Sequence, residues 1–289
     1  MDLKSICQFG RDSIVQYCPP LCFELTGKML ELVMDDGYDF FLNFTSDKTI
    51  EWKQAGEEAS TAHYECLKGD DTTYIVSYEL DNVTPRVNHT FVIDMENMLI
   101  TRIIARVGQN PRYPYLINTD FEFGAIRQEG KELTFKRHGY TSDMIGSAVQ
   151  WTYSSSLTTV HVYYCANFYR LISPQDDNKE PEADWAFTEL LGALPSSDEP
   201  AVYIKIKDGM YLFSLTEQNA EKLTQGRFQF RSNTLCFLQN YKRLYQVGRG
   251  FGTSTTPNGD INTNIMIGAY GKFTEVDPSF FTDPNPYVT

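Results

Sequence analysis

The 289-residue sequence predicts an all-β protein made of two consecutive antiparallel β-barrels. From residue 25 onward, apolar and polar residues alternate in short segments, which is the period of a β-strand. Turn residues join these segments, for example "DDG" at 35–37 and "KDG" at 207–209. The third observation is an internal repeat, which divides the chain into two similar halves.

The repeat is visible as a gap-free alignment. Residues 26–52 align on residues 145–171, with Gly27 opposite Gly146 and with strands and turns in the same order. A meander of seven or eight strands closes naturally into a small barrel, because closure leaves no unpaired strand edge. An eight-stranded barrel can be filled by its own side chains or can hold one small ligand. We therefore expect each half to form one barrel.

The repeat also sets the expected domain boundaries. Residues 108–130 look like the connection between the barrels, and residues 173–200 form an acidic insertion in the second one. A helix within this insertion can act as a lid over a barrel mouth, or it can pack on the surface for stability alone. The predicted domains are an N-terminal extension at 1–22, a first barrel at 23–130, a second barrel at 131–276 and an extended, proline-rich tail at 277–289.

Composition and charge limit the classes of partner. Hydrophobic residues make up 42% of the chain and aromatic residues 14%, which is enough for a real core. The net charge of -13 argues against nucleic acid and against anionic membrane surfaces, because both attract basic proteins. The sequence has no apolar run long enough for a membrane span. Its start lacks the apolar core of a signal peptide, so we expect a cytoplasmic protein.

Motif patterns indicate neither a metal site nor a cofactor. The six cysteines include no C-x-x-C pair, and we expect reduced, buried thiols. The motifs G-x-S-x-G and H-E-x-x-H are absent, which argues against common hydrolases and metalloenzymes. The stretch "GRGFG" at 248–252 ends a strand with no helix after it, so it is not a dinucleotide fingerprint. We therefore expect no cofactor.

Both halves contain stretches that carry a family resemblance. They are "LTGKMLELVMDDGYDFFLNFTSDKTIEW" at 25–52, "IGSAVQWTYSSSLTTVHVYY" at 145–164, "YIKIKDGMYLFSLTE" at 203–217, and "QVGRGFG" at 246–252 followed by "GAYGKF". Together they resemble the molybdenum cofactor biosynthesis protein F (MoaF) family over about residues 23–275. The resemblance implies a calycin-like, lipocalin-type fold in two consecutive units. It leaves the activity open, because such folds host simple binders, decarboxylases, cyclases and isomerases.

The strongest catalytic candidate is His161, in the predicted strand 157–164. It shares one face of this strand with Tyr163, while two valines share the other face. If the polar face points inward, His161 joins Trp151 and Tyr153 of the preceding strand in an aromatic-walled ligand pocket, where it could move a proton near neutral pH. If the valines point inward, His161 lies on the surface. The resemblance favours the inward orientation, because the family pattern also keeps a histidine in this strand.

Other second-half residues are weaker candidates. Arg249, at the end of a strand, can clamp a carboxylate or stabilise an enolate, or it can be a structural arginine that bonds turn carbonyls. Tyr203, Tyr211 and Tyr245 are expected to contact the substrate as walls or hydrogen-bond donors. Tyr245 stands where the family's usual pattern has a histidine.

The first half offers a second set of candidates. Its strands carry a more ordinary apolar pattern, but several polar or aromatic residues are placed to line a second cavity. These residues are Glu31, Tyr38, Trp52 and His63.

Three functions are consistent with these features. The first is a cofactor-independent cyclase, isomerase or lyase that acts on a small hydrophobic molecule held in a barrel. The second is a non-catalytic carrier or an accessory protein of molybdenum cofactor biosynthesis, although an anionic pterin would demand a basic pocket. The third is a structural protein with filled barrels. Assembly into a homodimer is left open.

Overall fold

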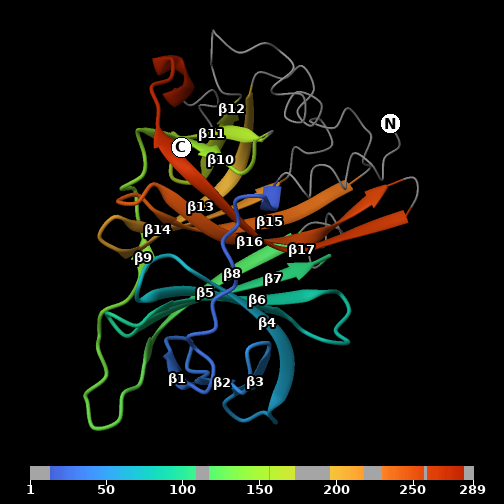
Figure 1. Ribbon diagram of the computed structural model, residues 1–289, viewed down its shortest axis with the longest axis vertical. Helices are drawn as coiled ribbons and strands as arrows, with labels where there is room; N and C mark the ends of the chain where they lie inside the picture. The colour runs from blue at the N-terminus through green and yellow to red at the C-terminus, as the bar shows by residue number, and fades with distance from the viewer. Residues whose placement is uncertain are drawn as a thin grey trace.

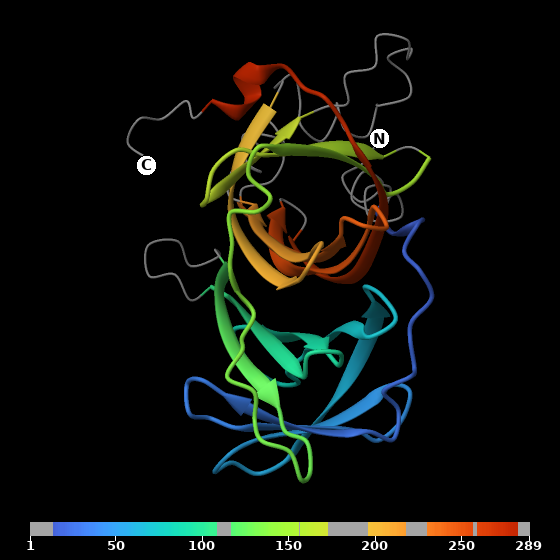
Figure 2. The same cartoon turned by 90° about the vertical axis from the view of Figure 1, so that its left-hand side faces the viewer.

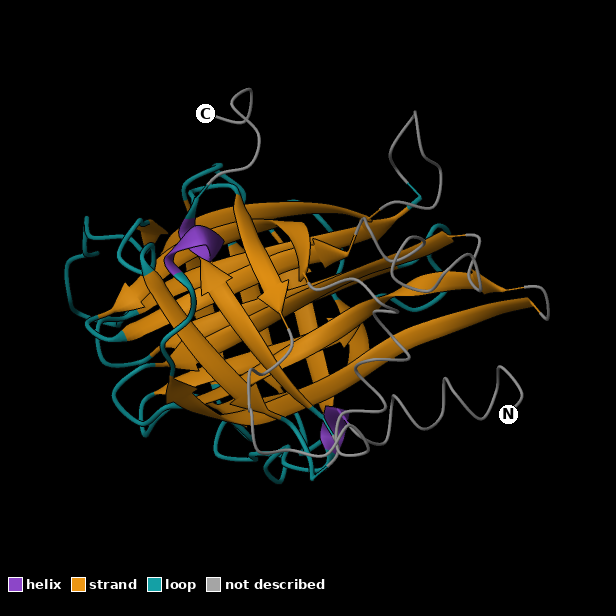
Figure 3. Ribbon diagram, turned by 90° about the horizontal axis from the view of Figure 1, so that it is seen from above, coloured by secondary structure: helices purple, strands orange, loops and turns teal. Residues whose placement is uncertain are grey.

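Two β-barrels lie one above the other in the computed structural model (Figures 1 and 2). The structure describes residues 14–108, 117–155, 157–172, 196–217, 230–256 and 259–282. Strands account for most of the described chain, as the orange elements of Figure 3 show. The predicted fold class, two consecutive antiparallel barrels, is confirmed.

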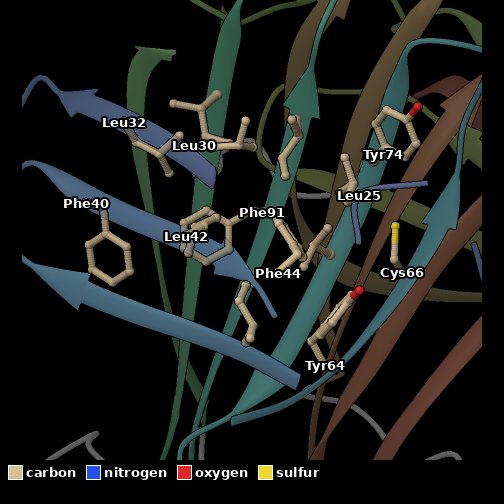
Figure 4. Close-up of a cluster of buried hydrophobic side chains, with 14 of the residues drawn as sticks. Leu25, Leu30, Leu32, Phe40, Leu42, Phe44, Tyr64, Cys66, Tyr74 and Phe91 are labelled. Atoms are coloured by element: carbon tan, nitrogen blue, oxygen red, sulfur yellow. The ribbon is translucent and has the colours of Figure 1, made fainter. Parts of the chain in front are cut away.

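The first barrel is a closed meander in which each strand pairs with its neighbour in sequence and β1 pairs with β8. Its strands are β1 (Met29–Met34), β2 (Phe40–Phe44), β3 (Thr49–Gln54), β4 (Ser60–Lys68), β5 (Thr73–Glu79), β6 (Val87–Asp94), β7 (Leu99–Val107) and β8 (Ile117–Ile126). Apolar side chains from the inward faces pack together inside this barrel, as Figure 4 shows for part of the cluster.

The second barrel closes through the pairing of β10 with β17 and of β12 with β13. Its strands are β10 (Ser147–Thr152), β11 (Thr158–Tyr163), β12 (Phe168–Ile172), β13 (Ser196–Lys207), β14 (Met210–Glu217), β15 (Phe230–Asn240), β16 (Tyr245–Thr256) and β17 (Gly259–Phe273). A two-residue strand, β9 (Gly139–Tyr140), adds to β13 outside the ring.

The internal repeat corresponds to equivalent strands. The alignment of 26–52 on 145–171 superimposes β1, β2 and β3 on β10, β11 and β12 in sequence. Gly27 and Gly146 are opposite each other in that alignment, and each precedes the first strand of its own barrel. Both glycines have positive φ angles, 79° and 89° respectively. Glycine adopts this left-handed conformation without steric cost, which explains why both turns use it.

Strand β8 lies within the segment that we expected to connect the barrels. Residues 117–126 pair with both β7 and β1 and close the first barrel, so the connection falls between β8 and β9 instead. The sequence did not predict this strand because its apolar side chains face outward and its polar side chains face inward, the reverse of the usual arrangement. Phe121 and Phe123 face outward toward the second barrel, while Asp120 and Glu122 lie on the inward face.

Two other segments differ from the expected boundaries. Residues 196–200, assigned to the acidic insertion, form the start of β13, and the predicted helix of the insertion lies outside the described residues. In the predicted tail, Pro278–Phe281 form a short 3-10 helix, η2. Phe280 and Phe281 pack against the outer apolar face of β10, β11 and β12.

The barrels pack through apolar outer faces. Leu67, Ile75 and Val92 of the first barrel meet Ile204, Leu212 and other residues of the second. The N-terminal segment bridges the two bodies along one side (Figure 2). Within it the backbone N–H of Tyr17 donates to the Tyr153 carbonyl of the second barrel, at 2.9 Å. The backbone N–H of Cys22 donates to the Cys66 carbonyl of the first, at 2.8 Å.

Candidate functional site

His161 lies on the inward face of β11, within the second barrel. Only 3% of its surface is exposed. Its imidazole is surrounded by aromatic rings, with ring centroids 5.0 Å from Tyr169, 5.5 Å from Phe213 and 6.2 Å from Tyr163. The valines on the other face of β11 pack under η2 instead. The structure therefore places His161 in an aromatic interior.

Five other side chains in the interior of this barrel form a hydrogen-bonded chain. The Trp151 indole donates to the Tyr163 hydroxyl at 3.2 Å. The Gln239 amide group contacts that hydroxyl through its oxygen and its nitrogen, and its nitrogen also donates to Gln246 at 2.8 Å. The Gln246 nitrogen in turn donates to the Tyr153 hydroxyl at 3.0 Å. This network satisfies buried polar atoms and fixes the shape of the barrel interior.

His161 does not take part in this network. Its Nδ1 is buried and has no hydrogen-bond partner among the described residues. The Thr159 hydroxyl, on the same face of β11, is likewise buried without a partner among these residues. Burial lowers the pKa of His161 to about 3, because the charged imidazolium cannot be hydrated there. The ring is therefore neutral at physiological pH, with one nitrogen that donates and one that accepts.

Tyr203 and Tyr211 also lie in the second barrel, but their hydroxyls are engaged. The Tyr203 hydroxyl donates to the Phe168 carbonyl at 2.7 Å, and its ring stacks on Phe213 at 5.7 Å between centroids. The Tyr211 hydroxyl lies 3.5 Å from an Asp143 carboxylate oxygen. Both rings can act as walls, and both hydroxyls already have a protein partner.

The structure does not bring Arg249 and Tyr245 into this interior. Both point outward from β16. Arg249 is buried between the barrels, where it pairs with Glu65 of the first barrel and with Asn264. The Tyr245 ring packs in a tilted arrangement against Tyr270, with 5.7 Å between ring centroids. Tyr245 also lines a surface cavity between the barrels.

Of the first-half candidates, the structure directs only Trp52 into a barrel interior. Glu31 lies on the outer face and pairs with Arg127 at 2.6 Å. Tyr38 is 55% exposed in a turn, and His63 is exposed on the outer face of β4. Trp52 packs on Phe40, with ring centroids 5.5 Å apart.

Sequence reasoning missed several buried polar residues. In the second barrel these include Gln239 and Gln246, whose type gives no signal of function, and Glu199, which had been assigned to the insertion. Glu199 is 1% exposed, pairs directly with Tyr169 in the ladder and lies on the same face of β13 as Ala201. In the first barrel they include His89 and Arg102. Their strands, β6 and β7, are buried on both faces, so the sequence pattern does not single these two residues out.

Comparisons with known proteins bear on the first barrel. Residues 11–109 match the family model of the MoaF N-terminal domain. The match spans β1 to β7, so the resemblance seen in the sequence is confirmed for this part of the chain. No curated protein matches the chain. A MoaF domain together with two closed barrels is consistent with a small-molecule-binding barrel protein.

The described residues contain no group of three or more histidine, cysteine, aspartate or glutamate side chains that could hold a metal ion. Among the same residues, no helix has the length and apolarity needed to cross a membrane.

Proposed function

We propose that the second barrel binds a small, largely apolar molecule and converts it without a cofactor, by isomerisation, cyclisation or elimination. The observation that carries this proposal is the unpartnered Nδ1 of His161 inside an aromatic interior. An unsatisfied buried polar group costs about 1–3 kcal/mol, so native interiors rarely contain one without a reason. A ligand that hydrogen-bonds to His161 supplies the missing partner.

The neutral state of His161 suggests how it would act. A neutral imidazole can donate a hydrogen bond to a substrate carbonyl and stabilise the enolate that forms when a neighbouring proton leaves. Glu199, on the inward face of β13 beside Tyr169, would accept that proton. The rings of Tyr163, Tyr169 and Phe213 would hold the apolar body of the substrate in a reactive conformation.

A non-catalytic carrier is the second candidate, and one observation favours it. The pKa of about 3 for His161 lies far below neutral pH, whereas an efficient proton shuttle has a pKa near the working pH. In a carrier His161 would only bind a polar group of the ligand.

An anionic pterin is a poor fit to this barrel. The fully buried arginines of the described residues are Arg102, Arg170 and Arg249. Arg102 belongs to the first barrel, Arg170 pairs with Asp198 at 2.6 Å on the outer face, and Arg249 lies between the barrels. An anion in the second barrel would therefore lack these cations as partners.

The test is turnover of small-molecule extracts from the source organism, followed by mass spectrometry. We compare the wild type with His161→Gln, and with His63→Gln as a matched control because His63 is exposed on the other barrel. A product formed by the wild type and the control but not by a folded His161→Gln variant supports catalysis. Equal product from all three contradicts the role of His161. A molecule recovered unchanged from the wild type, without any product, identifies a carrier.

A further inference from the structure

The first barrel contains a polar cluster of its own, formed by neighbouring strands β5 to β8 (Figure 1). Its members are Tyr78, His89, Arg102 and Glu122. The Arg102 side chain is 5% exposed, and Tyr78 is fully buried. A guanidinium this deep in a barrel is costly unless its donors are satisfied.

The donors of Arg102 are only partly satisfied. Nη1 donates to Glu122 at 3.0 Å, and Nη2 lies 3.3 Å from Nε2 of His89. Nε is buried and has no partner among the described residues. One N–H of a buried cation therefore points at no acceptor.

The tautomer of His89 leaves a second donor free. Burial, followed by the charges of Arg102 and Arg106, lowers the pKa of His89 well below its usual range, so the ring is neutral. Because arginine can only donate, Nε2 of His89 must accept, and Nδ1 must carry the hydrogen. Nδ1 lies 3.3 Å from the Tyr78 hydroxyl, which therefore accepts this hydrogen. The hydroxyl's own proton then has no acceptor among the described residues.

Apolar rings surround these two donors. The Arg102 guanidinium lies over the Phe40 ring, 4.2 Å from its centroid. Trp52 stacks on Phe40 with parallel planes, and Phe91 lies 5.7 Å from Phe40 between centroids. Phe40 and Phe91 are labelled in Figure 4. Two side chains beside the cluster are only partly buried: Trp52, and Glu122, whose side chain is 22% exposed.

We propose that the first barrel is a second binding site, for a flat apolar molecule that carries a carboxylate. The carboxylate oxygens would accept the free N–H of Arg102 and the free O–H of Tyr78, and the flat body would lie against the partly exposed Trp52 side chain. The ligand would displace Glu122 toward solvent and take its place as counter-ion. An acceptor is required because the cluster offers unpaired donors, and an anion is favoured because arginine is a cation. This proposal is independent of His161, which lies in the other barrel.

The test uses 2-naphthoate as the probe and 2-naphthalenemethanol as an uncharged control, with binding measured by isothermal titration calorimetry. We expect saturable binding of 2-naphthoate, weaker binding of the alcohol, and a loss of affinity of about tenfold or more in Arg102→Gln. Tyr78→Phe should weaken binding by a smaller factor. His63→Gln, at an exposed position on the same barrel, should bind the probe as the wild type does.

The Glu122→Gln variant separates a loss of ligand binding from a folding defect. It removes the competing carboxylate but keeps Arg102, so it should bind 2-naphthoate more tightly than the wild type, a gain that a damaged fold cannot produce. Absence of saturable binding to the wild type overturns the proposal. Equal affinity of Arg102→Gln, or weaker binding by a folded Glu122→Gln variant, also overturns it.

Discussion

Several buried side-chain atoms of the described residues have no hydrogen-bond partner, and two of these atoms belong to basic side chains inside a barrel. His161 in the second barrel leaves Nδ1 unpaired, and Arg102 in the first leaves Nε unpaired. Neighbouring polar side chains, such as Gln239 and Gln246, are by contrast linked in a satisfied chain. Unpaired buried atoms are expected where a ligand completes the structure.

The low pKa of His161 predicts a measurable dependence of stability on pH. In the unfolded chain a histidine binds a proton below about pH 6.5, whereas His161 in the folded protein does so only near pH 3. Between these values the unfolded state holds more protons, so stability falls as the pH falls. Urea unfolding at pH 7 and pH 5 should show the wild type losing about 2 kcal/mol more than His161→Gln. Equal losses would show that His161 is not buried as a neutral ring.

Cys22 should be a more reactive thiol than Cys18, its neighbour in the N-terminal segment. A hydrogen bond from Cys66 is the main cause that lowers the pKa of Cys22 to about 6, whereas burial raises that of Cys18 to about 11. Cys22 also lines a surface cavity of about 380 Å³ together with Lys68. Iodoacetamide at pH 7 should alkylate Cys22 at least about tenfold faster than Cys18, as measured by peptide mass spectrometry. Cys66→Ala should slow the reaction, and similar rates at both cysteines would contradict the assignment.

At the level of strands, the alternation of side chains predicts which residues share a face. It does not predict whether that face lines the barrel interior or contacts the other barrel. The sequence correctly gave the order of the strands and the glycine turns at Gly27 and Gly146. It failed for β8, in which the aromatic residues face the partner barrel and the acidic residues face the interior. It also overlooked His89, because β6 is buried on both faces and reads as an ordinary core strand.

The pairing of β15 with β16 depends on a glycine with no room for a side chain. A Cβ on Gly248 would overlap the Cys236 carbonyl oxygen and lie 2.7 Å from a ring carbon of Phe237. Gly248→Ala should therefore lower the free energy of unfolding by about 3 kcal/mol. Gly139→Ala is the matched control, because nothing lies within 4 Å of its Cβ position, and it should change stability by less than about 0.5 kcal/mol. Similar denaturant midpoints for the two variants would contradict this packing.

For the whole molecule, the repeat predicts two barrels, but their contact surface could not be read from the sequence. Both faces of β5 are buried, and its outward residue Ile75 packs on the second barrel, so the alternation of buried and exposed positions disappears where the barrels meet. Arg249 illustrates the same limit. Its residue type suggested a ligand contact, and only the tertiary structure places it beside Glu65 of the other barrel.

Arg249 is therefore expected to stabilise the contact between the barrels. Arg249→Met leaves Glu65 without its cation at a largely buried interface and should cost about 3 kcal/mol in urea unfolding. Lys242→Met removes an exposed ion pair with Asp208 and should cost less than about 1 kcal/mol. Below its melting temperature, Arg249→Met should keep any activity that depends on His161. Loss of that activity in a folded Arg249→Met variant would assign Arg249 to the site after all.

The most direct test of the account is native mass spectrometry of the protein after incubation with a small-molecule extract of its source organism. A bound small molecule is expected on the wild type and on the His63→Gln control, and it should be lost from a folded His161→Gln variant. The same bound species on all three proteins, or none on the wild type, would contradict a ligand site at His161.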